Sequence, residues 1–279
     1  MRWVLAAVVV LAVAPSAFAD DFGILRGTQP TYRWSGIYGG GQVGYSSSVV
    51  NFGQAASSDI GFILRNTAIQ QDQQISQWSV LGSRSPVTTG VGAFIGYNIE
   101  WENLITGLEV NYNHVSLSAS SGSTITRSFT ESANLPAGHH YFYSLTVTGQ
   151  SALHMSDIAT FRLRGGVEEG SFLPYVFGGL AVARADFSNS ATLSFTATDF
   201  PDSSTPPLTP LPTLNFGPVT QGNTQSGSFA YGFATGAGVD VGLTPNVFVR
   251  GEFEYIYFAP LNGIHVTTAT GRVGGGLKF

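Results

Sequence analysis

The sequence predicts an all-β protein, an antiparallel transmembrane β-barrel of eight strands with short periplasmic turns and long extracellular loops. Three observations predict it: a hydrophobic export signal, a composition poor in charge but rich in glycine and aromatic residues, and segments in which apolar and polar residues alternate. Strand side chains point to opposite faces in turn, so such alternation gives each strand one apolar and one polar face.

The start of the chain is typical of a secretory signal peptide. Arg2 precedes an apolar run, and small residues around Ala17 and Ala19 lead up to Asp20. The run is too short for a spanning helix, which needs about 20 residues. No later stretch is a candidate spanning helix, and only helices and closed barrels satisfy their backbone groups in lipid. We therefore expect a signal peptide at 1–19, a short periplasmic segment at 20–33 and an outer-membrane barrel at 34–279.

The composition excludes several classes of protein. The 279 residues include 35 glycines, 20 phenylalanines and 11 tyrosines, whereas charged residues make up 10%, compared with about 25% in ordinary soluble domains. Cysteine is absent, so neither disulfides nor thiolate chemistry is expected. The formal net charge is −5 and the basic residues are not clustered. Nucleic acid is therefore not an expected partner.

Eight segments have the length and alternation that a tilted spanning strand requires, about 9 to 11 core residues. We place them at 35–45, 91–101, 104–117, 158–167, 173–186, 229–243, 247–258 and 266–279. If residues 141–149 paired as a separate spanning strand, the barrel would have ten strands.

The connections alternate in length. Tight turns are predicted at 102–103, 168–172 and 244–246, longer connections at 46–90, 118–157 and 187–228, and a short one at 259–265. A barrel with both termini in the periplasm shows this asymmetry. The long connections are expected to be solvated surface loops, although 118–157 could continue its two strands as a rigid hairpin. The proline-rich stretch 201–218 is expected to form a flexible tip, because proline cannot donate to a strand ladder.

The alternation also assigns faces. In 247–258 the residues Val249, Phe253 and Tyr255 should face lipid, and the charged residues between them should face the lumen. In 173–186 the same reasoning points Tyr175 and Phe177 toward lipid. An Arg or Lys facing lipid at mid-membrane costs about 2–4 kcal/mol, so charges should gather inside. The predicted lumenal charge network is Glu109, Arg162, Arg164, Arg184, Asp186, Asp240, Arg250, Glu252, Glu254 and Arg272. It could be a structural ion-pair plug or line a narrow conducting path.

Both ends of the predicted barrel resemble a known family. The segment WSGIYGGGQVGY at 34–45 and the ending GGGLKF at 274–279 are similar to the first and last strands of the small porin-like outer-membrane β-barrel proteins of Gram-negative bacteria, notably alphaproteobacteria. The resemblance implies an eight-stranded barrel like the OmpA/OmpX transmembrane domain. It also implies an assembly signature at Leu277 and Phe279 that the barrel-assembly machinery recognises.

Three functions are compatible with these features. The first is a structural and surface-interaction barrel, with outer-membrane lipid and lipopolysaccharide, the assembly machinery and a surface ligand of the loops as partners. The second is a small diffusion channel for ions or small solutes. The third, a lipid-modifying enzyme, would use His114 and Ser116 on one strand face, for which no acid on the same face is identified. His139 and His140 lack further ligands at metal spacing. We expect no catalytic site, no metal and no cofactor.

Overall fold

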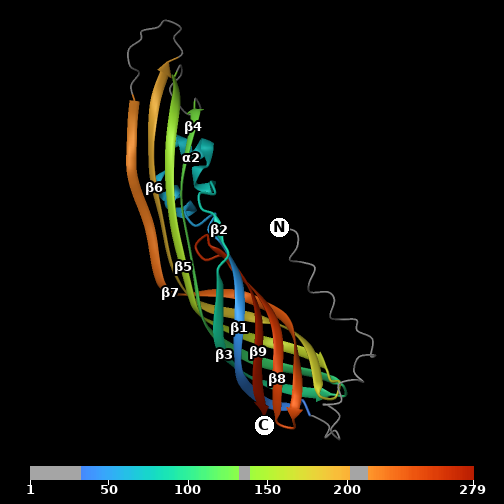
Figure 1. The fold of residues 1–279 in the computed structure, drawn as a ribbon. Helices are drawn as coiled ribbons and strands as arrows, with labels where there is room; N and C mark the ends of the chain where they lie inside the picture. The colour runs from blue at the N-terminus through green and yellow to red at the C-terminus, as the bar shows by residue number, and fades with distance from the viewer. Residues whose placement is uncertain (1–32, 132–138, 202–212) are drawn as a thin grey trace, which may run out of the picture.

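The computed structural model describes residues 33–131, 139–201 and 213–279, which form a closed barrel and a long sheet that rises from one side of it (Figure 1). The predicted signal peptide and nearly all of the predicted periplasmic segment lie outside the described residues. In the described part of the chain, no helix combines the length and the apolar character needed to cross a membrane.

Eight long antiparallel strands close the barrel, and the two-residue strand β2 (Ser83–Arg84) adds to its rim. The long strands are β1 Gly36–Asn51, β3 Val87–Trp101, β4 Leu104–Glu131, β5 His139–Val167, β6 Phe172–Pro201, β7 Thr213–Thr244, β8 Val247–Phe258 and β9 His265–Lys278. The first strand pairs with both β3 and β9, so Val43 lies opposite Val91 on one side and Val273 on the other. This double pairing closes the ring and confirms the predicted eight-stranded barrel.

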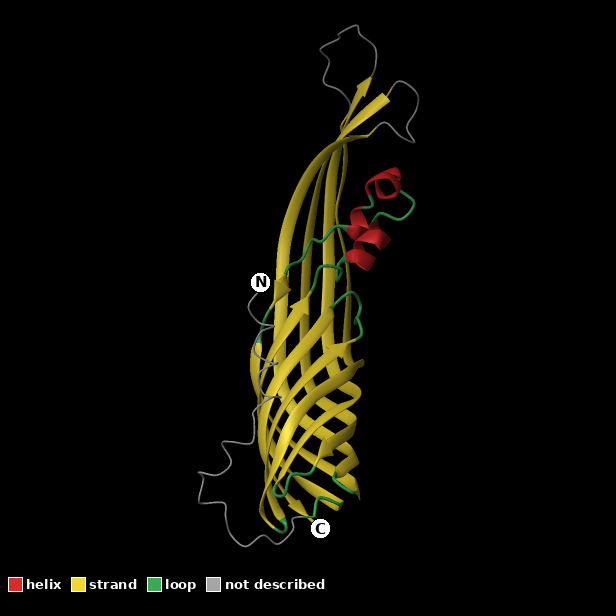
Figure 2. Cartoon of the chain, turned by 90° about the vertical axis from the view of Figure 1, so that its right-hand side faces the viewer, coloured by secondary structure: helices red, strands yellow, loops and turns green. Residues whose placement is uncertain are grey.

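Four strands continue far beyond the barrel, which corrects the predicted long loops at 118–157 and 187–228. The β4–β5 ladder runs to Glu131 paired with Tyr141, and residues 141–149 belong to β5 rather than to a separate spanning strand. We call the four-stranded sheet formed by β4–β7 beyond the barrel the projection (Figure 2). Beyond the membrane the inward face of these strands stays apolar, but the outward face is made of serine and threonine instead of apolar residues. The sequence pattern therefore underestimated the length of the strands.

The proline-rich stretch also contributes to a strand. Residues 213–218 are part of β7, and residues 202–212 lie outside the described part of the chain. The partner β8 joins β7 only from Gly232, so Pro218 lies on an edge strand. An edge strand tolerates proline because one side of its backbone needs no ladder partner. The prediction that all of 201–218 is a flexible tip is therefore wrong for 213–218.

The concave side of the projection is filled by the connection between β1 and β3. It contains α1 (Ser57–Ile63), α2 (Ala68–Gln73) and a 3-10 turn (Ile75–Gln77), which lie against the sheet in Figure 1. Apolar residues of this connection and of the inward face of the sheet are buried together in one cluster. From the connection come Phe52, Ile60, Leu64, Ile69 and Ile75, and from β5 and β6 come Leu145, Val147, Leu153, Ala191 and Leu193. This segment was predicted to be a solvated loop. Its apolar residues instead form a core outside the membrane.

The predicted faces hold for most strands and are reversed on one. The outward rows of β3, β7, β8 and β9 are as predicted, with Val273 62% and Phe253 46% exposed. On β6, Tyr175 and Phe177 are buried and point into the barrel, whereas Leu180 is exposed on its outer wall. Both faces of β6 are apolar there, so alternation alone could not choose between them.

We expect Phe253→Arg and Val273→Arg to impair assembly into the outer membrane. Each places a guanidinium on the lipid face, which costs about 2–4 kcal/mol near mid-membrane. Asn223→Arg is the matched control, because Asn223 is exposed on β7 in the projection. Heat-modifiable gel mobility of outer-membrane fractions measures the folded yield. Equal yields of all three variants would refute the assigned faces.

We expect Leu193→Ala to loosen the projection and leave the barrel intact. Leu193 is fully buried between the sheet and the β1–β3 connection, and such truncations cost about 2–5 kcal/mol. Limited trypsin digestion should then cut faster after Arg65, which follows α1, while the heat-modifiable mobility of the barrel stays unchanged. Unchanged cleavage at Arg65 would show that this core does not hold the connection in place.

Candidate functional site: the lumen of the barrel

The lumen is filled in three layers. At the periplasmic end, near the short turns, an apolar cluster closes the barrel. Its members are Trp34, Tyr38, Phe94, Ile105, Leu173 and Phe248. Phe248 lies at the centre of this layer, with ring centroids 6.3 Å from Trp34, 6.0 Å from Tyr38 and 6.1 Å from Phe94. The aromatic rings therefore block the periplasmic mouth.

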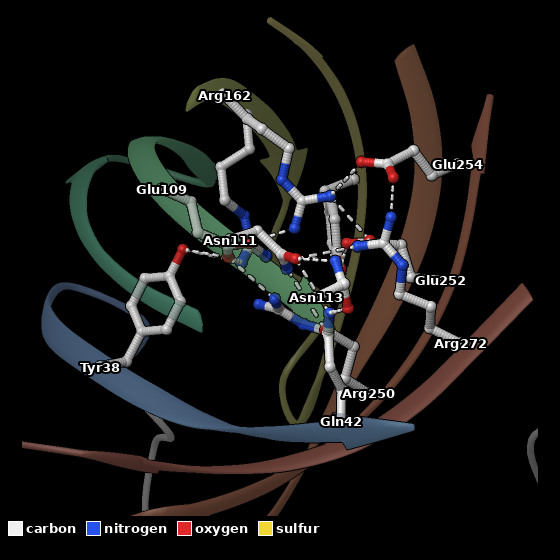
Figure 3. A network of polar contacts seen from close by, with 12 residues as sticks. Tyr38, Gln42, Glu109, Asn111, Asn113, Arg162, Arg250, Glu252, Glu254 and Arg272 are labelled. Carbon is white, nitrogen blue, oxygen red and sulfur yellow. Dashed lines mark hydrogen bonds and ion pairs between the residues drawn. The ribbon is translucent and has the colours of Figure 1, made fainter. Parts of the chain in front are cut away.

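The middle layer is a buried network of eight charges drawn from five strands, most of which are labelled in Figure 3. The residues are Glu109 on β4, Arg162 and Arg164 on β5, Asp240 on β7, Arg250, Glu252 and Glu254 on β8, and Arg272 on β9. Each is at most 6% exposed. Four guanidinium groups face four carboxylates, so the network is formally neutral. The structure thus brings together eight of the ten residues that the sequence proposed.

One half of the network centres on Arg250. Its Nη1 lies 2.8 Å from Glu109 Oε2, and its Nε lies 2.8 Å from Asp240 Oδ1. Arg164 binds the same two acids, with Nη2 2.7 Å from Asp240 Oδ2 and Nη1 3.4 Å from Glu109 Oε2. Two bases, on β5 and β8, therefore share two acids, on β4 and β7.

The other half centres on two glutamates of β8. Arg162 Nη1 lies 2.7 Å from Glu252 Oε1 and 3.2 Å from Glu254 Oε1. Arg272 Nη1 lies 3.2 Å from Glu252 Oε1, and Arg272 also pairs with Glu254. Arg162 pairs with Glu109 as well and so joins the two halves. A buried charge is stable only when it is paired. Each member of the network has at least one ion-pair partner, while Arg272 Nε has no hydrogen-bond partner among the described residues.

Neutral side chains that were not among the predicted lumenal residues complete the network. Tyr38 donates to Glu109 Oε2 at 2.8 Å, and Tyr175 donates to Glu252 Oε2 at 3.0 Å. The Gln42 Nε2 amide donates to Asn111 at 2.9 Å and to Asn113 at 2.7 Å. The sequence pattern could have predicted that these amides face the lumen, because each alternates with apolar residues on its strand. The inward position of Tyr175 was hidden by the reversed face of β6.

Aromatic rings also cover the guanidinium groups. The Arg164 guanidinium carbon lies 3.8 Å from the centroid of the Tyr175 ring, and that of Arg250 lies 4.0 Å from the Phe94 ring. The electron-rich face of a ring attracts a cation, and more strongly where water is excluded. These contacts link the charged layer to the aromatic layer beneath it.

The third layer is apolar and lies toward the outside. Alanines of β6 and β7 face larger apolar side chains of β8 there, and all belong to the same cluster as the core of the projection. They are Ala181, Ala183, Ala230, Ala234, Ile256 and Phe258. The barrel interior and the projection therefore share one continuous hydrophobic core.

Two predicted members of the network lie elsewhere. Arg184 is exposed and Asp186 half-buried, and both lie on the outer face of β6. Asp186 Oδ1 accepts a hydrogen bond from the backbone N–H of Gly227 at 2.5 Å. Their neighbours Ala183 and Ala185 face inward. The prediction that Arg184 and Asp186 face the lumen is therefore wrong. It assigned the two faces of β6 the wrong way round, which is also why Tyr175 was predicted to face lipid.

His114 and Ser116 lie on the outer wall, and His114 does have an acid partner. His114 Nδ1 is 2.9 Å from Asp157 Oδ1, which also accepts a hydrogen bond from the Tyr112 hydroxyl at 2.7 Å. The expectation that no acid shares this face is therefore wrong. Asp157 is paired with His114 across the β4–β5 ladder, and this long-range register was not predicted. Among the described residues, no hydrogen bond joins Ser116 to His114.

The predicted assembly signature lies at the lipid-facing end of β9. Leu277 is 52% and Phe279 is 80% exposed. The Phe279 backbone N–H donates to Ile37 O at 2.9 Å, which ties the end of the chain to β1. Recognition by the assembly machinery stays a prediction.

We expect Arg250→Ala to destabilise the folded barrel by about 3–5 kcal/mol, because it leaves Asp240 and Glu109 short of positive charge in a buried site. Arg84→Ala is the control, since exposed Arg84 makes one hydrogen bond, to Ser120 O at 3.0 Å. Reversible urea unfolding in lipid vesicles, followed by tryptophan fluorescence, gives the free energy of unfolding of both variants. If the free energy of unfolding fell equally little in Arg250→Ala and Arg84→Ala, the network would contribute little to stability.

Comparisons with known proteins give several similar solved structures and one matching family. A search of curated proteins finds no match. Among solved structures, the chain is similar to Neisserial surface protein A, with 13% identity, 88% of this chain and 98% of that one covered, and a TM-score of 0.36. It is also similar to Ail, the attachment invasion locus protein of Yersinia pestis, with 15% identity, coverages of 88% and 99%, and a TM-score of 0.32.

A third similar structure is the N-terminal β-barrel domain of Pseudomonas aeruginosa OprF, with 12% identity, coverages of 85% and 97%, and a TM-score of 0.29. The family model described as "Outer membrane protein beta-barrel domain" matches residues 4–279. The chain therefore belongs to the outer membrane protein β-barrel domain family and resides in the outer membrane.

Proposed function

We propose that this protein is a closed outer-membrane anchor that displays the projection as a rigid surface for interaction with partners outside the cell. One observation carries the proposal: the lumen is filled from end to end, while half of the barrel strands continue outward as a paired and packed sheet. The chain thus stabilises an external surface rather than an internal passage.

The filled lumen argues against a diffusion channel. A conducting path through an eight-stranded barrel needs space that side chains normally occupy. Here the aromatic layer lies on the periplasmic side of the charges, and the alanine-rich layer lies on the other. The balanced charges pair with one another. We therefore favour the structural ion-pair plug over the conducting path.

The outer face of the projection has the properties of a recognition surface. Pairs of hydroxyl groups face each other across its strands, such as Thr126 and Thr146 at 3.0 Å and Thr192 and Thr220 at 2.8 Å. Hydroxyl groups both donate and accept hydrogen bonds. A rigid scaffold also lowers the entropy lost on binding. This face would suit a polar partner, such as a matrix component or the surface of another cell.

The arrangement gives little support to an enzyme. His114 is oriented by Asp157, but Ser116 is not engaged as a nucleophile, and hydroxyl activation requires contact with the base. We place the barrel-assembly machinery and outer-membrane lipids, including lipopolysaccharide, among its partners. This rests on the terminal strand and on the apolar outer wall.

The proposal predicts that shortening the projection abolishes surface interaction while the barrel still assembles. One variant joins Ser120 to Ala152 and Ser188 to Thr224 by two-residue turns, since these residues are directly paired. Cells that display it are compared with wild type for aggregation with one another and for adherence to fibronectin-coated plastic. We expect both to fall to the level of cells without the protein.

A point variant separates recognition from folding. Thr146→Lys changes the outer face of the projection, and Ser85→Lys makes the same change in the exposed connection before β3. We expect only Thr146→Lys to weaken the interaction. Full interaction by cells that display the shortened chain would contradict the proposed function.

A further inference from the structure

A shallow apolar groove crosses the outer wall of the barrel. Two adjoining hollows, each of about 750 Å³, lie on the lipid-facing side and share Val43 and Val273 in their lining. One extends toward β7 and β8, and the other extends toward β3 and β4. Together they span six neighbouring strands.

The groove follows a single row of paired residues. Val239 pairs with Gly251, Gly251 with Val273, Val273 with Val43, Val43 with Val91, and Val91 with His114. Every member of this row lines one of the two hollows. Strands lie about 4.8 Å apart, so the row is about 24 Å long. Because the strands tilt by about 35–45°, the row rises by about 15 Å along the barrel axis, compared with about 25 Å for the apolar band on such barrels.

Outward-facing glycines, which have no side chain, create the groove. A Cβ added at Gly251 or Gly271 would meet no atom within 4 Å, so both glycines leave open space outside the wall. At Gly41 the nearest atom to such a Cβ would be 3.8 Å away. Larger outward residues stand beside them, including Tyr45 at 59% and Phe253 at 46% exposure. The result is a narrow apolar trough between ridges.

The two ends of the groove differ in height and chemistry. Val273 lies five residues before the last residue of β9, whereas His114 lies ten residues after the first residue of β4, so the row rises toward the outside. At the upper end the lining includes Thr89, His114 and Ser116. Asp157 is fixed beside His114 and also accepts from Tyr112. A polar cluster therefore lies at the outer end of the apolar trough.

We propose that this groove is a binding site for one lipid of the outer leaflet. An acyl chain lies along the glycine floor, and the polar head of the lipid hydrogen-bonds the His114–Asp157 pair. The occupant follows from the location, since the wall faces hydrocarbon and a hollow there is filled by a lipid chain. The polar end fits a head that carries hydroxyl, amide or phosphate groups. The site is independent of the proposed surface interaction, because it uses none of the projection.

The test is native mass spectrometry of the mature protein, extracted from outer membranes in a mild detergent. Gly251→Leu and Gly271→Leu fill the trough. Gly165→Leu is the matched control, because an added Cβ there also meets no atom within 4 Å but Gly165 lies on β5, away from the groove. Heat-modifiable mobility confirms that each variant is folded.

We expect wild type and Gly165→Leu to retain one lipid per barrel, and the groove variants to retain about one tenth as much, a loss equivalent to about 1.4 kcal/mol. His114→Ala should also lower retention. Equal retention in all variants, or equal loss in Gly165→Leu, would overturn the site. Unchanged retention in His114→Ala would overturn the placement of the head. An adduct with the mass of a second chain, lost in Gly251→Leu, would show that another barrel occupies the groove.

Discussion

The narrowness of an eight-stranded barrel is the constraint on which the rest of this structure depends. Such a lumen is only just wide enough for side chains, so any charge inside it must find a partner among its neighbours. Four arginines and four acids satisfy one another here, with Arg162 as the link between the two halves. Aromatic rings below and alanines above exclude water, which strengthens each ion pair.

The same strands that enclose the charges also build the projection. Arg162 and Arg164 lie on β5, and farther from the periplasm that strand carries Leu145 and Val147 into the core outside the membrane. The register shifts between the barrel and the projection on each of the β4–β5, β5–β6 and β6–β7 ladders. The lumenal charges therefore hold the register of the barrel, and the apolar core outside the membrane holds that of the projection. A one-residue slip within the barrel would turn the charges of that strand toward lipid.

The sequence predicted the inward and outward faces of a strand correctly where the two faces meet different surroundings. On β8 the outward residues meet lipid and the inward Arg250, Glu252 and Glu254 meet one another, so alternation was sufficient. On β6 it failed because Tyr175 and Phe177 pack under guanidinium groups inside the lumen. The projection was missed because its outer face is made of serine and threonine, which resemble a loop in composition. The His114–Asp157 pair depends on β4–β5 register and could not be predicted from spacing.

We propose that the balanced charge network seals the barrel, and single-channel conductance measures this seal. The protein, folded in a planar bilayer, is compared with Arg250→Ala, in which the guanidinium that binds both Asp240 and Glu109 is removed. We expect a silent wild type and intermittent openings in the variant, because unpaired buried acids draw water into the lumen. Discrete, reproducible openings of the wild type would show that the network does not seal the barrel and that the lumen is a conducting path.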